Sequence, residues 1–306
     1  MAQLKTLGWA KFYRGYENEF GRGKIMNWLT EHKIPLGSWM ESFVDWLIDV
    51  AGFFFDFLSE VLETLILTMV DAIEWLHPFA VIGLILLGAW FLHRSIGLLV
   101  FISLALLLIL NLGYWTETIQ TLVLVVSATF ISVLIGVPLG IAAAHRPWLY
   151  TIMRPILDLM QTIPTFVYLI PTLILFGLGY VPGLISTIIF AVAAPIRLTY
   201  LGISKVPNEL VEAGLAFGCT KSKLLYKVEL PAAMPNIMAG ITQCIMLSLS
   251  MVVIAALVGA DGLGKPVIRA LNTVNISQGF EAGIAIVLVA IMLDRICKSP
   301  SSGKEE

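Results

Sequence analysis

The chain has few charged residues for its length. Only 13% of its 306 residues are charged, 58% are hydrophobic, and the mean hydropathy is +0.90. Several stretches without any charge exceed the about 20 residues that a membrane-spanning helix needs. This composition excludes an ordinary water-soluble domain. It predicts an all-α polytopic membrane protein.

The usual signs of a chemical site are also missing. The three cysteines, Cys219, Cys244 and Cys297, lack the spacing of a metal site. The four histidines are scattered over polar breaks, and no catalytic constellation appears. No basic cluster alternates with aromatic residues, which argues against nucleic acid as a partner. We therefore predict no catalytic residue and no metal ligand in this chain.

One glycine-rich stretch is close to a phosphate-binding loop. Residues 259–266, GADGLGKP, almost match the pattern G-x4-G-K-[ST]. Pro266 stands where the pattern has the hydroxyl that contacts Mg²⁺, and no strand–loop–helix unit surrounds the stretch. We interpret it as a glycine-rich turn that re-enters the membrane on the outer side. No other candidate for ATP binding exists in the sequence.

Seven apolar stretches predict membrane spans. The charge-free run 159–196 is too long for one helix, and the turn residues Gly177–Gly183 divide it. Pro235 is expected at the entrance of one span, and residues 261–278 are expected to form a polar loop. The predicted spans are 75–92, 95–115, 118–144, 159–178, 183–204, 236–260 and 279–295.

Positive charge distinguishes the two sides of the membrane. The basic breaks between spans all fall on one side, which places that side and the C-terminus in the cytoplasm. They are His93-Arg94, Arg146–Arg154, Lys205–Lys227 and Arg295–Lys298. Counting back places the N-terminus outside, whereas the excess of Lys and Arg in residues 1–33 favours the inside. The sequence leaves both open.

The N-terminal quarter is different in character. Residues 1–38 form a polar arm, and residues 39–76 predict an amphipathic helix with one possible break near Gly52. At 100° per residue its acidic side chains fall within an arc of about 120°. A helix lying in the membrane interface keeps these carboxylates in water, and it could brace the membrane domain as a scaffold. Packing against another chain, or a true span, is the alternative. The acidic residues are Glu41, Asp45, Asp49, Asp56, Glu60, Glu63, Asp71 and Glu74.

The longest polar interruption of the second half is the loop 205–231. Start and stop residues predict a short helix over 208–217 and a second one from about Thr220 that ends before Pro231. Small residues gather where the first helix ends: Ala213, Gly214, Ala216 and Gly218. Such a surface allows another protein to approach the backbone closely.

This loop resembles the cytoplasmic loop signature of ATP-binding-cassette (ABC) importer permeases, E-A-A-x3-G-x9-I-x-L-P. The matching residues are Glu212, Ala213, Gly214, Gly218, Val228, Leu230 and Pro231. The resemblance implies a type I ABC importer transmembrane domain over residues 77–298. It also implies that the loop 205–231 couples this domain to an ATPase. Residues 299–306 form a polar tail.

The most informative membrane stretch is 158–171. Gln161, Thr162, Thr165 and Tyr168 stand there between prolines in an apolar span. Polar groups in a span usually face a partner helix or a water-filled path, which makes these four residues candidates for a translocation pathway. Local hydrogen bonds that repair the proline breaks are the alternative. A second motif, Gly136-Val-Pro138-Leu-Gly140, predicts either close helix packing or a kink.

Together with residues 195–198, 230–240 and 249–254, this stretch resembles a narrower group. These are the permease subunits of glycine betaine/L-proline importers, a family that carries quaternary ammonium osmolytes, and the resemblance covers about residues 115–297. It implies a multi-pass protein of the bacterial cytoplasmic (inner) membrane that is not itself an enzyme. The implied partners are a second copy of the chain, two cytoplasmic ATPase subunits that bind ATP and Mg²⁺, and an external substrate-binding protein. The chain itself needs no cofactor.

Several solutes fit the resemblance. Glycine betaine, proline betaine, choline and trimethylamine N-oxide are all possible, and a related importer for an amino acid such as methionine is an alternative. An ion-coupled secondary carrier is a further alternative from another class. It would need no ATPase-docking loop and would show paired broken helices in corresponding halves, a repeat that the sequence lacks.

Overall fold

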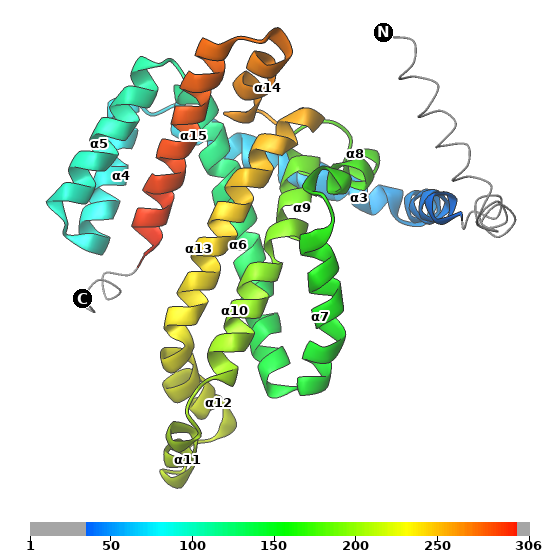
Figure 1. Cartoon of the computed structure of the whole chain (residues 1–306), viewed down its shortest axis with the longest axis vertical. Coiled ribbons are helices and arrows are strands. Elements are labelled where there is room, and N and C mark those ends of the chain that lie inside the picture. The colour runs from blue at the N-terminus through cyan, green and yellow to red at the C-terminus, as the bar shows by residue number, and fades with distance from the viewer. Residues whose placement is uncertain (1–34, 299–306) are drawn as a thin grey trace, which may run out of the picture. The chain divides into compact units, whose positions relative to one another are not determined.

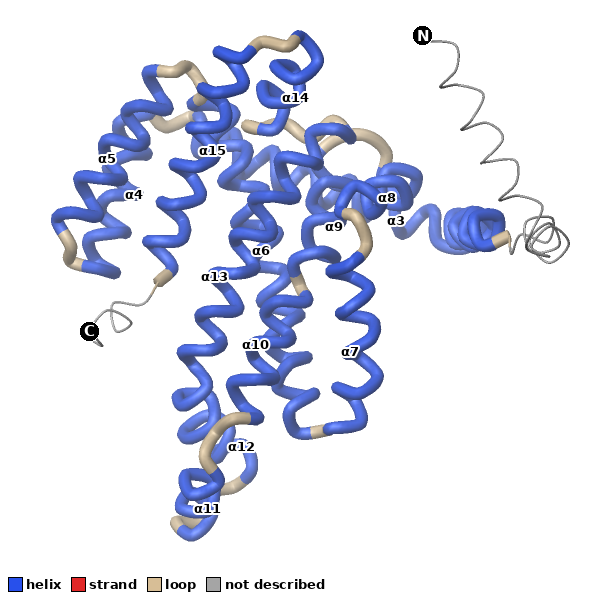
Figure 2. The backbone as a smooth tube through the Cα atoms, viewed as in Figure 1, coloured by secondary structure: helices blue, strands red, loops and turns tan. Residues whose placement is uncertain are grey.

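The structure, a computed structural model, describes residues 35–298. Its described part consists of helices joined by short loops, without a strand (Figure 2). Backbone polar groups inside a bilayer must be satisfied within helices or closed barrels, so the apolar stretches fold as helices. The tail 299–306 and most of the arm 1–38 lie outside the described residues.

The amphipathic stretch forms one helix, α3 (Leu36–Glu74). It runs through Gly52 without the predicted break, because a single glycine is tolerated inside a strongly periodic helix. All eight acidic side chains are exposed, and so are Phe54, Phe57 and Leu65 on the other side. Ile66 and Val70 are buried in the core. At the break between α3 and α4 (Pro78–His93) the chain bends by 101°.

Four helices form the centre of the unit that comprises residues 51–306. These are α6 (Trp115–His145), α9 (Tyr180–Ala191), α10 (Ala193–Ser204) and α13 (Leu230–Ala255). In Figure 1, α10 continues the line of α9, and this combined segment runs beside α6 and α13. Leu124 of α6, Leu184 of α9 and Val252 of α13 are buried in one cluster.

Two glycines allow α6 and α10 to approach closely. A Cβ on Gly136 would lie 2.8 Å from Pro195 Cγ, and one on Gly140 would lie 2.7 Å from the Ile196 carbonyl oxygen. The small-residue spacing therefore serves close packing. Pro138 lies inside α6, which continues to His145.

A second group of helices comprises α4, α5 (Ile96–Asn111) and α15 (Ile276–Cys297). Ile82 and Ala89 of α4, Ile102 and Leu106 of α5, and Met292 of α15 are buried together. The apolar side chains of these short helices thus form a small core of their own.

The described residues contain four helical segments that are long and apolar enough to cross a membrane, and up to six if each bent pair counts as one span. The four are 115–145, 180–204, 221–258 and 276–297. All seven predicted spans fall on helices. However, α4 and α5 have 16 residues each, fewer than the about 20 needed to span, so the count of seven stays a prediction.

The predicted span 159–178 does not form one straight helix. The chain forms α7 (Pro147–Thr162), a 3₁₀ turn (Thr165–Tyr168) and α8 (Leu169–Phe176), with a bend of 105°. Pro164 lacks an N–H donor and disfavours helical backbone at Ile163, so the helix ends there. The predicted start at Leu159 was wrong, because α7 is amphipathic and continues past its charged residues.

The prediction of a polar loop over 261–278 is wrong as well. Residues Gly264–Thr273 form α14, whose first turn contains Pro266, a position where proline fits a helix. The glycine-rich turn before it has positive φ at Gly259 and Gly262, and α13 with a short 3₁₀ turn precedes it. The Leu263 N–H donates to Thr121 Oγ1 at 2.8 Å, which fixes the turn on α6. The turn is therefore structural.

Candidate coupling loop and translocation pathway

The loop between α10 and α13 carries α11 (Asn208–Ala216) and α12 (Lys221–Leu224), which lie together at one end of the bundle (Figure 1). The first predicted helix is confirmed. Pro207 precedes it, and Gly218 ends it with a φ of +75°. The Gly218 N–H donates to the Leu215 carbonyl at 2.9 Å, which closes the last turn.

The second predicted helix does not end before Pro231. After α12 the chain forms a π-helical turn, Leu225–Glu229, and continues directly into α13. Pro231 stands in the first turn of α13 and Pro235 lies inside that helix, not at its entrance. A proline cannot donate to the preceding turn, and a π turn is one way to take up this defect. The loop is thus joined to α13 through continuous helix.

The signature residues have different environments. Glu212 and Ala213 are exposed, whereas Gly214 is buried. A Cβ on Gly214 would lie 2.7 Å from Leu224 Cδ1 and 3.3 Å from Val228 Cγ2, so this glycine packs α11 against the following turns. A Cβ on Gly218 would meet nothing within 4 Å, and Gly218 is needed for its backbone conformation. Leu230 is half-buried and Pro231 exposed.

The loop also carries an exposed apolar surface that was not predicted from the sequence. Phe217 is 90% exposed, and Leu210, Leu215 and Tyr226 are also exposed. Apolar side chains in contact with water often mark a protein-binding surface. The signal in the sequence was the run Leu-Ala-Phe directly before Gly218.

A contact between His145 and the buried Glu229 fastens this loop to α6. Glu229, in the π-helical turn, is buried, and its Oε2 lies 2.9 Å from His145 Nε2 at the end of α6. His145 Nδ1 donates to the Ile141 carbonyl at 2.9 Å, because a carbonyl can only accept. Both ring nitrogens are therefore engaged. This link could not be predicted, since the two residues are 84 positions apart in the sequence.

The four candidate pathway residues lie around the bend after α7. Gln161 and Thr162 end α7, and Thr165 and Tyr168 bound the 3₁₀ turn. The Thr162 hydroxyl donates to the Asp158 carbonyl at 2.9 Å, and the Tyr168 hydroxyl donates to the Met160 carbonyl at 2.8 Å. The Tyr168 hydroxyl satisfies the Met160 carbonyl, which Pro164 cannot bond because it has no N–H, as the alternative interpretation expected. The Thr162 hydroxyl bonds to a carbonyl one turn earlier in its own helix. Gln161 and Thr165 are half-buried.

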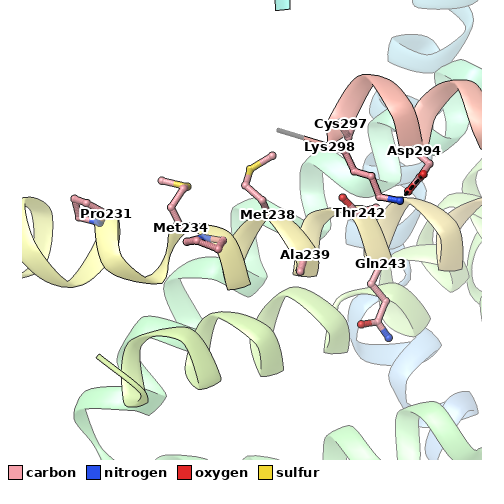
Figure 3. Close-up of a pocket in the computed structure, with 10 residues that line it drawn as sticks. Pro231, Met234, Met238, Ala239, Thr242, Gln243, Asp294, Cys297 and Lys298 are labelled. Carbon is pink, nitrogen blue, oxygen red and sulfur yellow. Dashed lines mark hydrogen bonds and ion pairs between the residues drawn. The ribbon is translucent and has the colours of Figure 1, made fainter. Parts of the chain in front are cut away.

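A groove opens between α13 and the end of α15 (Figure 3). Its volume is about 630 Å³, and it begins at Pro231, the last signature residue. Met234 and Met238 project into it from α13, and Asp294 and Lys298 form an ion pair of 2.7 Å at its other end. The groove thus lies directly beside the coupling loop.

A polar pocket of about 360 Å³ lies at the start of α6, the end of this helix away from His145. It is lined by Glu117 near the start of α6 and by Asp261, Lys265 and Arg269 around α14, and Lys265 pairs with Asp261. This pocket was not predicted, because residues 261–278 were expected to form a loop and not a helix. Within residues 35–298 no group of acidic, His or Cys side chains could hold a metal ion.

The described chain has apolar spans, close glycine contacts between the central helices and a loop of short helices at one end. These features are typical of a helical membrane permease. Residues 136–296 match the family described as "Binding-protein-dependent transport system inner membrane component". This match covers more than half of the chain, and the chain belongs to this family. It is a multi-pass protein of the bacterial inner membrane and a transport subunit.

Relatives of known role are similar over nearly the whole chain. The glycine betaine transport system permease protein OpuAB of Bacillus subtilis (strain 168) is 45% identical over 87% of this chain and 94% of the relative. The glycine betaine/carnitine transport permease protein GbuB of Listeria monocytogenes is 46% identical over 87% and 95%. ProW of Escherichia coli (strain K12), a glycine betaine/proline betaine permease protein, is 41% identical over 87% and 75%.

A solved structure has the same fold. The MetNI methionine ABC transporter in an inward-facing conformation matches with a TM-score of 0.51 at 24% identity, over 57% of this chain and 88% of the other. This likeness concerns the fold alone. The predicted type I ABC importer transmembrane domain is confirmed.

Proposed function

We propose that this chain is the permease subunit of an ATP-driven importer for glycine betaine and related quaternary ammonium solutes. The observation that carries the proposal is the 45% and 46% identity to two glycine betaine permeases over 87% of the chain. A trimethylamine N-oxide permease protein of Ruegeria pomeroyi is also 40% identical over 61% of this chain, and its solute belongs to the same chemical class.

We propose two copies of this chain, two ATPase subunits and an external binding protein as the working complex. ATP and Mg²⁺ bind to the ATPase subunits, so this chain needs no cofactor. The polar pocket lined by Glu117, Asp261, Lys265 and Arg269 lies at the end opposite the coupling loop. Its mixed charges suit the surface of a binding protein, because complementary charges orient two docking proteins.

The loop 205–231 transmits the movement of the ATPases. Phe217 and Leu215 provide exposed apolar contacts, and Glu212 provides an exposed carboxylate for a charge-assisted hydrogen bond. Buried aromatic side chains dominate the binding energy of many interfaces, so Phe217 is the expected anchor. Continuous helix through Pro231 carries the movement into α13, and alternating access follows.

The translocation pathway includes Gln161, Thr162, Thr165 and Tyr168. A quaternary ammonium group cannot donate a hydrogen bond, so its passage needs aromatic faces and few fixed charges. Thr162 and Tyr168 contribute mainly by shaping the bend, since their hydroxyls are bound to the backbone. Gln161 and Thr165 are the two whose polar atoms can face the solute.

Uptake into liposomes tests this function. The complete complex, with binding protein and ATP, is expected to accumulate glycine betaine and to be inhibited by vanadate but not by ionophores. An ion-coupled carrier would give the opposite sensitivity. Accumulation of methionine without glycine betaine would instead support an amino-acid importer.

A further inference from the structure

The two ends of the longest charge-free run meet in the structure. Residues 159–196 contain no charge, and the run is bounded by Asp158 on α7 and Arg197 on α10. Arg197 Nη2 lies 2.7 Å from Asp158 Oδ1. Arg197 lies inside the apolar segment 180–204, about two turns before the predicted cytoplasmic end of α10 at Ser204. The pair therefore lies on the cytoplasmic side of the bend after α7.

Asp158 begins a row of polar side chains on α7 that leads to the bend after this helix. On a helix, positions three and four apart share a face, so Asp158 is aligned with Gln161 and Thr162. On the neighbouring side of α7, Leu157 packs with Ala193 and Ile196 of α10 in an apolar contact. The charges therefore lie at the edge of the α7–α10 contact.

Both side chains remain accessible. The Arg197 side chain is 32% exposed and that of Asp158 is 52% exposed. Ionisable groups near an apolar layer face water or a polar path, because lipid cannot solvate them. An exposed ion pair contributes little stability, so this pair can open readily and exchange its partners.

We propose that Asp158 and Arg197 form a binding site for a small zwitterion at the cytoplasmic end of the pathway. The proposal rests on the function proposed above. When the pair opens, the guanidinium of Arg197 binds the carboxylate of the solute in bidentate fashion, and Asp158 faces its cationic end. The ion pair between Asp158 and Arg197 is thus replaced by two ion pairs, one between each residue and the zwitterion. A cation without a carboxylate leaves Arg197 without a partner.

Aromatic surface lies next to this site. Tyr200, one turn from Arg197 on α10, stacks on Tyr150 of α7 with ring centroids 3.5 Å apart. The outer ring faces can attract a quaternary ammonium group. A solute that leaves Asp158 thus meets aromatic surface on the cytoplasmic side.

The test compares transport with ATP hydrolysis in the reconstituted complex. Arg197→Gln and Asp158→Asn should lower glycine betaine uptake per ATP about tenfold or more, the loss expected for a charge-assisted hydrogen bond. Hydrolysis stimulated by the binding protein should stay close to that of the unaltered complex. Arg197→Lys should retain part of the uptake. For Arg197→Gln the loss should be larger for glycine betaine than for choline, which lacks a carboxylate.

The control is Asp56→Asn, which removes an exposed carboxylate of α3 outside the groove, the polar pocket and the coupling loop and should change neither quantity. If uptake and hydrolysis fall together in the Arg197 and Asp158 variants, the pair is only a structural link and the proposal fails. An equal loss for both solutes, or no loss, overturns it as well. Failure of the unaltered complex to take up glycine betaine would instead refute the proposed function.

Discussion

At the scale of single residues, two glycines of the same signature are required for different physical reasons. Gly214 is buried and leaves room for Leu224 and Val228, whereas Gly218 is exposed and has a φ of +75°. The sequence analysis treated both as part of a bare docking surface. A sequence motif shows that glycine is required at a position. It does not show whether the reason is a lack of space for a side chain or the backbone conformation.

A substitution series at Gly218 separates these reasons. Gly218→Ala should reduce the ATP hydrolysis that the binding protein stimulates, because a left-handed backbone costs a non-glycine residue about 1–2 kcal/mol. Gly218→Asn should retain most of it, since asparagine tolerates this conformation better. Gly218→Trp should abolish it, because the ring adds bulk where we propose that the ATPase docks. Full stimulation with Trp would show that the loop does not transmit the movement.

At the scale of elements, the coupling loop is held between two long helices. The π-helical turn joins it to α13, and the pair His145–Glu229 joins it to α6. Movement of the loop therefore acts on both helices. The two partners are unequally buried, since the His145 side chain is 46% exposed and that of Glu229 is 10% exposed.

This asymmetry predicts unequal effects of mutation. His145→Ala leaves a buried carboxylate without a partner, and the exposed remainder of the site screens it only in part. Its cost should be about 1–3 kcal/mol of stability. Glu229→Ala should cost less, because the half-exposed imidazole can bind water. Thermal unfolding of the purified complex would measure both, and a larger loss for Glu229→Ala would contradict the proposed electrostatics.

Elements were predictable where periodicity and charge agreed. The helix 208–216 and the break at Gly177 followed from local residues, as did the close contact at Gly136 and Gly140. The start of α7 was missed because Arg154 and Asp158 resembled the end of a membrane segment, although they lie on one side of an amphipathic helix. The contacts of Asp158 with Arg197 and of His145 with Glu229 depend on tertiary packing, which a single sequence does not record.

At the scale of the whole molecule, the two ends of the bundle differ in character. The end with α11 and α12 carries lysines and exposed apolar side chains, and the end with α14 carries the polar pocket with charges of both signs. Figure 1 places α12 and α14 at opposite ends. An importer needs such a difference, because one end docks ATPases and the other receives a binding protein.

This arrangement predicts opposite accessibility for two exposed serines, Ser222 in α12 and Ser277 in the first turn of α15. The excess of positive charge predicts that the loop of Ser222 lies in the cytoplasm, and one predicted crossing, the segment 221–258, separates it from Ser277. In a background with Cys219, Cys244 and Cys297 replaced by serine, an impermeant maleimide should label Ser277→Cys in spheroplasts. It should label Ser222→Cys only after the membrane is opened. Labelling of both without opening would mean that the segment 221–258 does not cross the membrane, and the coupling loop could not then reach an ATPase.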